Sequence, residues 1–145
     1  MVESEIAGIS AEIYEGENRV QMQIVYLRTK DGGECIPIAM GCPEAMALVD
    51  TSHLDRLVPP TIPEFGIYDL ICRFIFGLGA TVNAVVISDL VHYTYYTKLI
   101  LDTKDFPRLE VDCRPSDALN IAVRTRTPIF VNEEVIRKLE SVAGE

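Results

Sequence analysis

The sequence of 145 residues lacks the patterns that mark membrane-spanning, exported and zinc-binding proteins. No apolar run approaches the roughly 18 residues that a membrane-spanning helix needs. The first ten residues, MVESEIAGIS, contain two glutamates and no basic residue, unlike a signal peptide. The four cysteines form no C-x-x-C pair, so we expect them to be reduced and mostly buried. The default prediction is a cytoplasmic protein with no membrane partner.

Several catalytic motifs are also missing. The sequence contains no G-x-x-x-x-G-K-[ST] loop, no G-x-G-x-x-G, no G-x-S-x-G and no H-E-x-x-H. The two histidines, His53 and His92, stand alone in unrelated contexts. Basic residues are scarce as well: the net charge of −9 opposes indiscriminate nucleic-acid binding. Residues 103–128 depart from this balance, with five basic residues against four acidic ones.

Hydrophobic periodicity predicts strands and helices that do not strictly alternate. The first forty residues indicate a three-stranded meander in which Pro37 marks an edge or bulge. Gly77 and Gly79 are expected to end one helix, and Asn132 to cap another. The sequence predicts one compact α+β or mixed α/β domain over residues 1–145, with a mixed or antiparallel sheet and about four helices. Strands are expected at 6–14, 20–28, 35–40, 81–90, 95–102, 109–113 and 128–131; helices at 42–54, 64–80, 115–127 and 133–142, with a proline-rich connection at 58–63.

The start of the third predicted helix, CRPSDALN, has a structural interpretation. Ser116 would be the N-cap, Pro115 would fix the entry into the helix, and Asp117 would complement the helix dipole. Arg114 would then pair with Asp112 or Asp117.

The same residues also have a functional interpretation. Arg114, the Ser116 hydroxyl and the free N–H groups of a helix start form a good phosphate site, and Arg124 extends the positive potential. Carboxylates at Asp112 and Asp117 could hold a divalent metal ion. Phosphate-binding charge beside metal-binding carboxylates is what phosphodiester hydrolysis requires. The residues alone leave both interpretations open.

Three blocks of the sequence resemble the bifunctional nuclease domain family. They are RPSDALNIAVRTRTPIFVNEEVI, CIPIAMGCPEAMAL and LGATVNAVVISDLVHYTYYTKLIL. The likeness is strongest over residues 18–138. It implies a compact α/β domain that forms homo-oligomers (dimers or larger) and a nuclease or hydrolase activity on DNA and RNA.

The resemblance, carried over position by position, implies a set of site residues. Glu44, Asp69 and Asp117 become candidates for catalysis and for binding Mg²⁺ or Mn²⁺. Arg114, Ser116 and Arg124 become candidates for binding phosphate. In the rival interpretation these residues are caps and ion pairs, and the protein is a non-catalytic oligomeric module that binds an anion or small ligand.

The chain departs from the family pattern at three places. Tyr68 stands where many relatives have a histidine, so a role for that side chain as base or ligand would be lost or replaced. Arg126 stands in place of a glycine that follows the third helix. His92 and Tyr93 replace the Asp-Gly turn of the hairpin.

Overall fold

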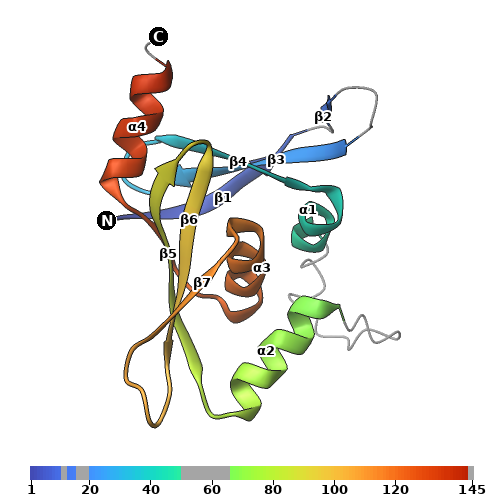
Figure 1. Ribbon diagram of the computed structural model, residues 1–145, viewed down its shortest axis with the longest axis vertical. Coiled ribbons are helices and arrows are strands. Elements are labelled where there is room, and N and C mark those ends of the chain that lie inside the picture. The colour runs from blue at the N-terminus through green and yellow to red at the C-terminus, as the bar shows by residue number, and fades with distance from the viewer. Residues whose placement is uncertain (11–12, 16–19, 50–65, 144–145) are drawn as a thin grey trace.

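The computed structural model describes residues 1–10, 13–15, 20–49 and 66–143, which form one mixed sheet and four helices (Figure 1). This confirms the predicted α+β fold. The strands are β1 (Val2–Ile9), β2 (Ile13–Glu15), β3 (Val20–Thr29), β4 (Cys35–Gly41), β5 (Thr81–Val91), β6 (Thr94–Asp102), β7 (Leu109–Cys113) and β8 (Ile129–Val131). The helices are α1 (Cys42–Val49), α2 (Ile67–Gly77), α3 (Pro115–Thr125) and α4 (Glu133–Ala143).

The sheet joins an N-terminal meander to a C-terminal hairpin through the short strand β8. Strands β1 and β2 pair with successive parts of β3, and β4 pairs with β3 along residues 35–41. Strand β8 runs antiparallel to β1 and parallel to β5. Strand β5 pairs antiparallel with β6, and β6 pairs antiparallel with β7. The expected meander is confirmed, and Pro37 lies in β4 at the end of the sheet, where a missing N–H is tolerated.

One predicted strand was wrong in its extent. The strand expected at residues 6–14 is two strands, β1 from Val2 to Ile9 and β2 from Ile13 to Glu15. Within β1, the register with β3 shifts between Ile6 and Gly8. A glycine in a strand favours such a bulge. The helix expected at 42–54 is described as far as Val49, and the connection at 58–63 lies outside the described residues.

The hairpin between β5 and β6 closes with a two-residue turn. His92 and Tyr93 have φ angles of 49° and 63°, so both occupy the left-handed region. Tight hairpin turns require this backbone because it matches the right-handed twist of the strands. Asparagine and glycine adopt it most readily, so this chain closes the hairpin with two unfavourable residues.

Local sequence signals fix the end of α2 and the start of α4. Gly79, with a φ of 78°, follows α2, and the Gly79 and Ala80 N–H groups donate to the carbonyls of Phe76 and Ile75. These bonds form the expected Schellman motif. The Asn132 Oδ1 accepts from the Glu134 N–H at 3.1 Å, which confirms that cap.

The prediction that Ser116 is an N-cap was wrong. Arg114 is the N-cap of α3, with extended backbone, and no side chain supplies the cap hydrogen bond. The reason is Pro115, whose ring keeps the preceding residue out of the helical region and itself occupies the first helical position. Ser116 is therefore already inside the helix.

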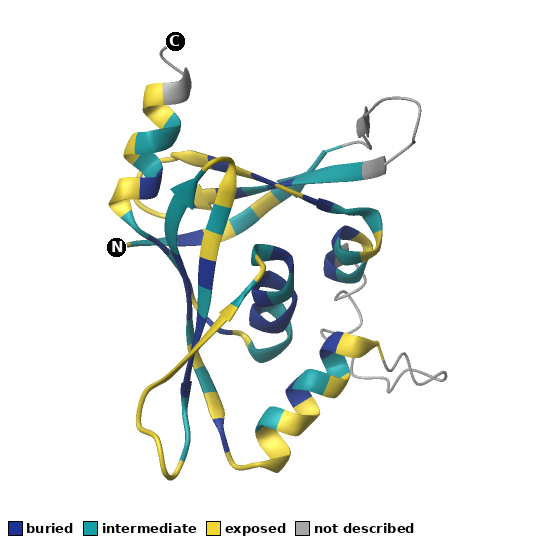
Figure 2. Ribbon diagram, in the orientation of Figure 1, coloured by how far each residue is buried: buried dark blue, intermediate teal, exposed yellow. Residues whose placement is uncertain are grey.

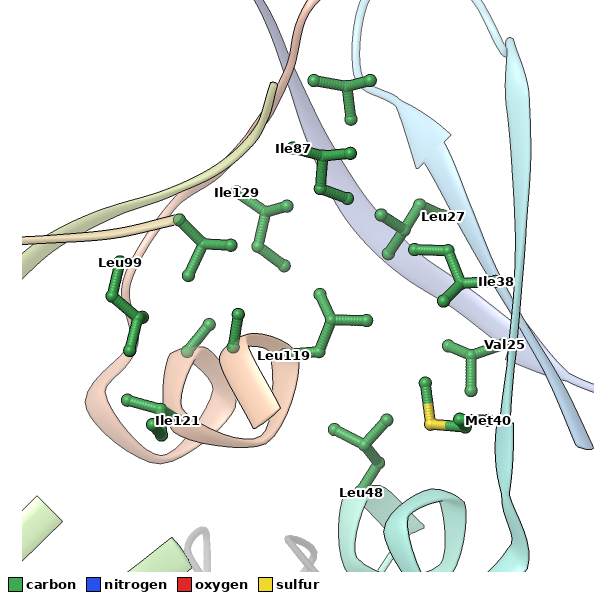
Figure 3. Packing of buried hydrophobic residues seen from close by; sticks show 14 of the residues in the cluster. Val25, Leu27, Ile38, Met40, Leu48, Ile87, Leu99, Leu119, Ile121 and Ile129 are labelled. Carbon is green, nitrogen blue, oxygen red and sulfur yellow. The ribbon is translucent and has the colours of Figure 1, made fainter. Parts of the chain in front are cut away.

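The core lies between the sheet and helix α3. Strands β3, β4 and β5 contribute side chains that lie on the Leu119 side of α3 (Figure 3). Figure 2 shows α3 as mostly buried, whereas α2 is largely exposed. Burial of α3 fits its small-residue face, since Ala118 and Ala122 are 0% and 1% exposed and let the helix approach the sheet closely.

The four cysteines differ in burial. All four cysteines are free, as expected, but Cys72 alone is buried, so the prediction that most are buried was wrong.

Helix α2 exposes Ile67, Leu70 and Phe74 along one side. Among the described residues, none of the helices combines the length and apolarity that crossing a membrane requires.

Candidate functional site

A bidentate ion pair between Arg114 and Asp117 lies at the start of α3. Arg114 donates from Nε to Asp117 Oδ2 and from Nη2 to Asp117 Oδ1, both at 2.9 Å. The pair is local, because residues i and i+3 share a helix face and Asp117 sits in the first turn. The Arg114 side chain stays 66% exposed, whereas that of Asp117 is 26% exposed. The guanidinium thus faces solvent while its partner is largely covered.

Tyr68, in the first turn of α2, joins this pair from the other side. Its hydroxyl donates to Asp117 Oδ1 at 3.1 Å. Burial, assisted by the bond to Asp117, raises the pKa of Tyr68 to about 12. Hydrogen bonds from Arg114 and Tyr68 lower the pKa of Asp117 against the opposing effect of burial. Tyr68 is therefore a neutral donor at ordinary pH, and Asp117 is an anion with both oxygens engaged.

A second cluster is centred on Arg124, near the end of α3. It holds helices α1, α2 and α3 together. The Arg124 side chain is 7% exposed, and its Nε donates to Asp69 Oδ1 at 3.1 Å. Its Nη1 donates to the Asn120 carbonyl and Oδ1, and its Nη2 donates to the Ala47 carbonyl. The guanidinium carbon also lies 5.5 Å from the Tyr68 ring centroid. Arg124 is better suited to fixing α1 and α2 on α3 than to binding phosphate.

Asn120 connects the two clusters. It is 0% exposed, and its Nδ2 donates to the Glu44 carbonyl at 3.1 Å and to the Ser116 carbonyl at 2.9 Å. Its Oδ1 accepts from Arg124, so both halves of the amide are used. A buried amide with all its groups satisfied fixes the orientation of its neighbours. Asn120 therefore holds the start of α1 against α3.

Glu44, in the first turn of α1, places its carboxylate near Arg114. Its Oε1 lies 3.9 Å from Arg114 Nη2, and its side chain is 24% exposed. A Cβ at Gly41 would lie 2.5 Å from Glu44 Oε2, so the glycine leaves space for the carboxylate to fold back. Glu44, Gly41, Arg114 and Ser116 all line one groove of about 970 Å³. Of the three candidate acids, Glu44 is the one that lines this groove.

The three candidate carboxylates lie in two different clusters. Glu44 and Asp117 both face Arg114, whereas Asp69 pairs with Arg124. Within the described part of the chain, no three His, Cys, Asp or Glu side chains are grouped so that they could hold a metal ion. Since arginines already compensate Asp69 and Asp117, the residues present do not fit a three-carboxylate metal site. The Arg114–Asp117 pair is not buried either, since the Arg114 side chain is 66% exposed.

Two residues of the site, Tyr68 and Asn120, were not among the candidate site residues predicted from the sequence. Tyr68 was noted as a departure from the family pattern, and the structure makes it the partner of Asp117. Asn120 carried a weak signal, because it is a polar residue at the center of a helix whose neighbours are small and apolar. Its contacts with Glu44 and Arg124 depend on how three helices pack, which the sequence does not display.

Comparison with known proteins shows the family. The model of the bifunctional nuclease domain matches residues 25–143, so the chain belongs to the bifunctional nuclease domain family. The matched region contains α1, α2 and α3, and with them every candidate site residue.

Named relatives give the same family at moderate identity. An uncharacterized protein of Mycobacterium tuberculosis is 33% identical over 137 residues, covering 94% of this chain and 74% of the relative. Bifunctional nuclease 1 of Oryza sativa subsp. japonica is 31% identical over 115 residues, covering 77% of this chain and 33% of that protein. Bifunctional nuclease 2 of Arabidopsis thaliana is 30% identical over 115 residues, covering 75% and 32%. This chain thus spans about a third of the plant relatives.

Proposed function

We propose that the protein hydrolyses phosphodiester bonds of DNA or RNA at the groove beside α3. The observation that supports this most directly is that Arg114, Ser116 and Glu44 line the same groove. A cation and a hydroxyl next to a carboxylate supply the groups that phosphate binding and water activation require. Family membership and the nuclease names of the plant relatives support the reaction class.

Each group has a distinct part in this proposal. The exposed Arg114 guanidinium and the Ser116 hydroxyl bind the non-bridging phosphate oxygens and stabilise the charge that develops on them. The Glu44 carboxylate accepts a proton from a water molecule as the water oxygen attacks phosphorus. The bond from phosphorus to the departing sugar oxygen then breaks, and that oxygen takes a proton from solvent. Asp117 is a positioning residue, because both of its oxygens accept from Arg114 or Tyr68.

Dependence on Mg²⁺ or Mn²⁺ stays a prediction, as do direct roles of Asp69 and Asp117 as ligands. The contacts of those two carboxylates with arginine do not support a metal site, so no step is assigned to a metal. Cleavage measured in EDTA and with each ion added separately tests the requirement. Equal rates in EDTA and with metal would contradict it.

The decisive experiment compares cleavage of labelled RNA and DNA by variants purified identically. We expect Glu44→Gln to abolish cleavage. We expect Gly41→Ala to lower it substantially, because the added Cβ displaces the Glu44 carboxylate without removing its charge. Arg137→Met, in an exposed pair on α4, is the matched surface control and should cleave normally. Full activity in a folded Glu44→Gln protein would refute the assigned role.

One observation favours a second candidate, a non-catalytic homo-oligomeric binding module. The exposed apolar residues of α2 suit a subunit contact, and the Arg114–Asp117 pair with Tyr68 forms a closed network that needs no substrate. Absence of cleavage by the wild-type protein on single- and double-stranded DNA and RNA, with and without metal, would favour this candidate.

A further inference from the structure

The groove beside α3 is larger and more apolar than phosphate binding requires. It lies between strand β4, the tip of the β5–β6 hairpin and the start of α3. The Tyr95 hydroxyl donates to the Pro37 carbonyl at 2.7 Å, which holds the hairpin tip against β4. The apolar part of the lining includes Met22, Pro37, Ala39, Leu90, Tyr93 and Leu139. Grooves of this size and character bind flat or apolar groups of a ligand.

The polar part of the groove lining includes the hydroxyl of Ser116. Ser116 is 7% exposed, and its side chain makes no hydrogen bond within the part of the chain that the structure describes. Among the described residues, Thr97 Oγ1 is the one fully buried side-chain polar atom without a partner, so the Ser116 hydroxyl itself keeps contact with solvent. Its position in the groove, beside the exposed Arg114, identifies an acceptor on a ligand as its natural partner.

Charge limits the kind of ligand that the groove can bind. Arg114 is the one cationic side chain among the described residues that line it, and the chain carries a net charge of −9. Attraction to a phosphate backbone grows with the number of phosphates that basic residues neutralise. Here that number is about one. The affinity for a nucleic acid must therefore come mainly from apolar contact with its bases.

We propose that this groove binds the unstacked bases of a single-stranded nucleic acid, while Arg114 and Ser116 hold the adjoining phosphate. The inference rests on the proposed function and names its substrate. Bases in a duplex are stacked and paired, so their faces are not available to the groove. In a single strand, bases pack against aromatic and apolar side chains irrespective of sequence. Tyr93, 94% exposed at the hairpin tip, is placed for this contact.

Binding of fluorescein-labelled hexanucleotides, followed by anisotropy in EDTA, tests the proposal separately from cleavage. The ligands are a single-stranded DNA or RNA hexamer, the blunt duplex of the same sequence, and an abasic hexamer that keeps the phosphates. We expect the duplex and the abasic strand to bind at least about tenfold more weakly than the single strand.

A groove-filling variant supplies the second test. Ala39 is exposed on β4 and lines the groove, so Ala39→Trp fills it without disturbing the core or Arg114. Ala7→Trp, on an exposed position of β1 that does not line this groove, is the control. We expect Ala39→Trp to weaken binding of the hexamer about tenfold and Ala7→Trp to leave it unchanged.

The outcomes separate this inference from the proposed function. Equal affinity for the abasic and normal strands, or for duplex and single strand, overturns the inference, even if the protein cleaves nucleic acid. An unchanged affinity in Ala39→Trp overturns it as well. If no oligonucleotide is bound or cleaved, the proposed function fails, and the inference fails with it.

Discussion

Replacing Arg124 by methionine should strongly destabilise the protein. Methionine keeps an unbranched side chain of similar reach but removes the guanidinium that joins the three helices. Asp69 loses its ion-pair partner, and three acceptors on Asn120 and Ala47 lose their donors. Since the Arg124 side chain is 7% exposed, water cannot simply take its place.

The size of the effect follows from the burial of each partner. Removing one member of a buried ion pair costs about 3–5 kcal/mol, because the other charge is left unpaired. Asp69 keeps 22% exposure and can be partly rehydrated, which favours the lower end of that range. The acceptors on Asn120 and Ala47 add roughly 1 kcal/mol each where water does not reach them. We therefore expect a loss of about 3–6 kcal/mol in the free energy of unfolding, the upper value applying if water reaches none of the three acceptors.

Urea unfolding followed by circular dichroism measures this loss. The control is Arg137→Met, since Arg137 pairs with Glu134 on α4 and both side chains are mostly exposed. Such a pair contributes no more than about 1 kcal/mol, so the control should unfold close to the wild type.

A different pattern would refute the structural role of Arg124. If Arg124→Met unfolded within about 1 kcal/mol of the wild type, the contacts with Asp69 and Asn120 would not be stabilising the fold. If the same folded variant also lost nucleic-acid binding, Arg124 would bind phosphate, as the family resemblance implies.

Three further predictions concern the hairpin, α2 and Asp117. Replacing His92 and Tyr93 by Asn-Gly should stabilise the protein by about 1 kcal/mol in urea unfolding, because both residues occupy the left-handed region; an unchanged midpoint would contradict this. Phe74→Glu on the exposed side of α2 should dissociate a homo-oligomer in sedimentation experiments, whereas Phe106→Glu should not; equal effects would place the contact elsewhere. Because hydrogen bonds lower the pKa of Asp117 in the folded state, its stabilising contribution is present above about pH 4 and is lost as pH falls through the lower folded value. Asp117→Asn should therefore flatten the acid side of the stability profile measured by urea titration, and an unaltered profile would refute the pairing.

The sequence predicted those parts of the fold whose causes are local. Gly79 after α2 and Asn132 before α4 act on backbone within a few residues of themselves, so their roles could be read directly. Ser116 was misassigned although the correcting signal was adjacent, because Pro115 already forces Arg114 to be the N-cap. The predicted start of α3 was therefore wrong because two local signals competed, Ser116 as a capping residue and Pro115 as the first helical residue.

The sequence pointed to Arg114 and Asp117 but not to Tyr68 or Asn120, and it did not give the pairing of acids with arginines. Arg114 and Asp117 are three residues apart on one helix, so their contact was among the alternatives considered. Tyr68 and Asp117 are separated by 49 positions, and Asp69 and Arg124 by 55. Which acid meets which arginine depends on how α2 packs against α3. Hydrophobic periodicity does not give that packing, since α2 exposes its apolar residues Ile67, Leu70 and Phe74.

The pairing has a consequence for how tightly the site can bind a bare anion. Arg114 already faces two carboxylates, Asp117 at 2.9 Å and Glu44 at 3.9 Å, so an arriving phosphate competes with both for one guanidinium. Like charges at these separations repel, and the exposure of Arg114 screens its attraction. Inorganic phosphate and the unlabelled hexanucleotide should therefore both displace a labelled single-stranded hexanucleotide. The concentration of phosphate required should be at least about tenfold higher. Competition followed by anisotropy at constant ionic strength measures the two midpoints. Displacement by phosphate and by hexanucleotide at the same concentration would mean that the phosphate site alone accounts for binding.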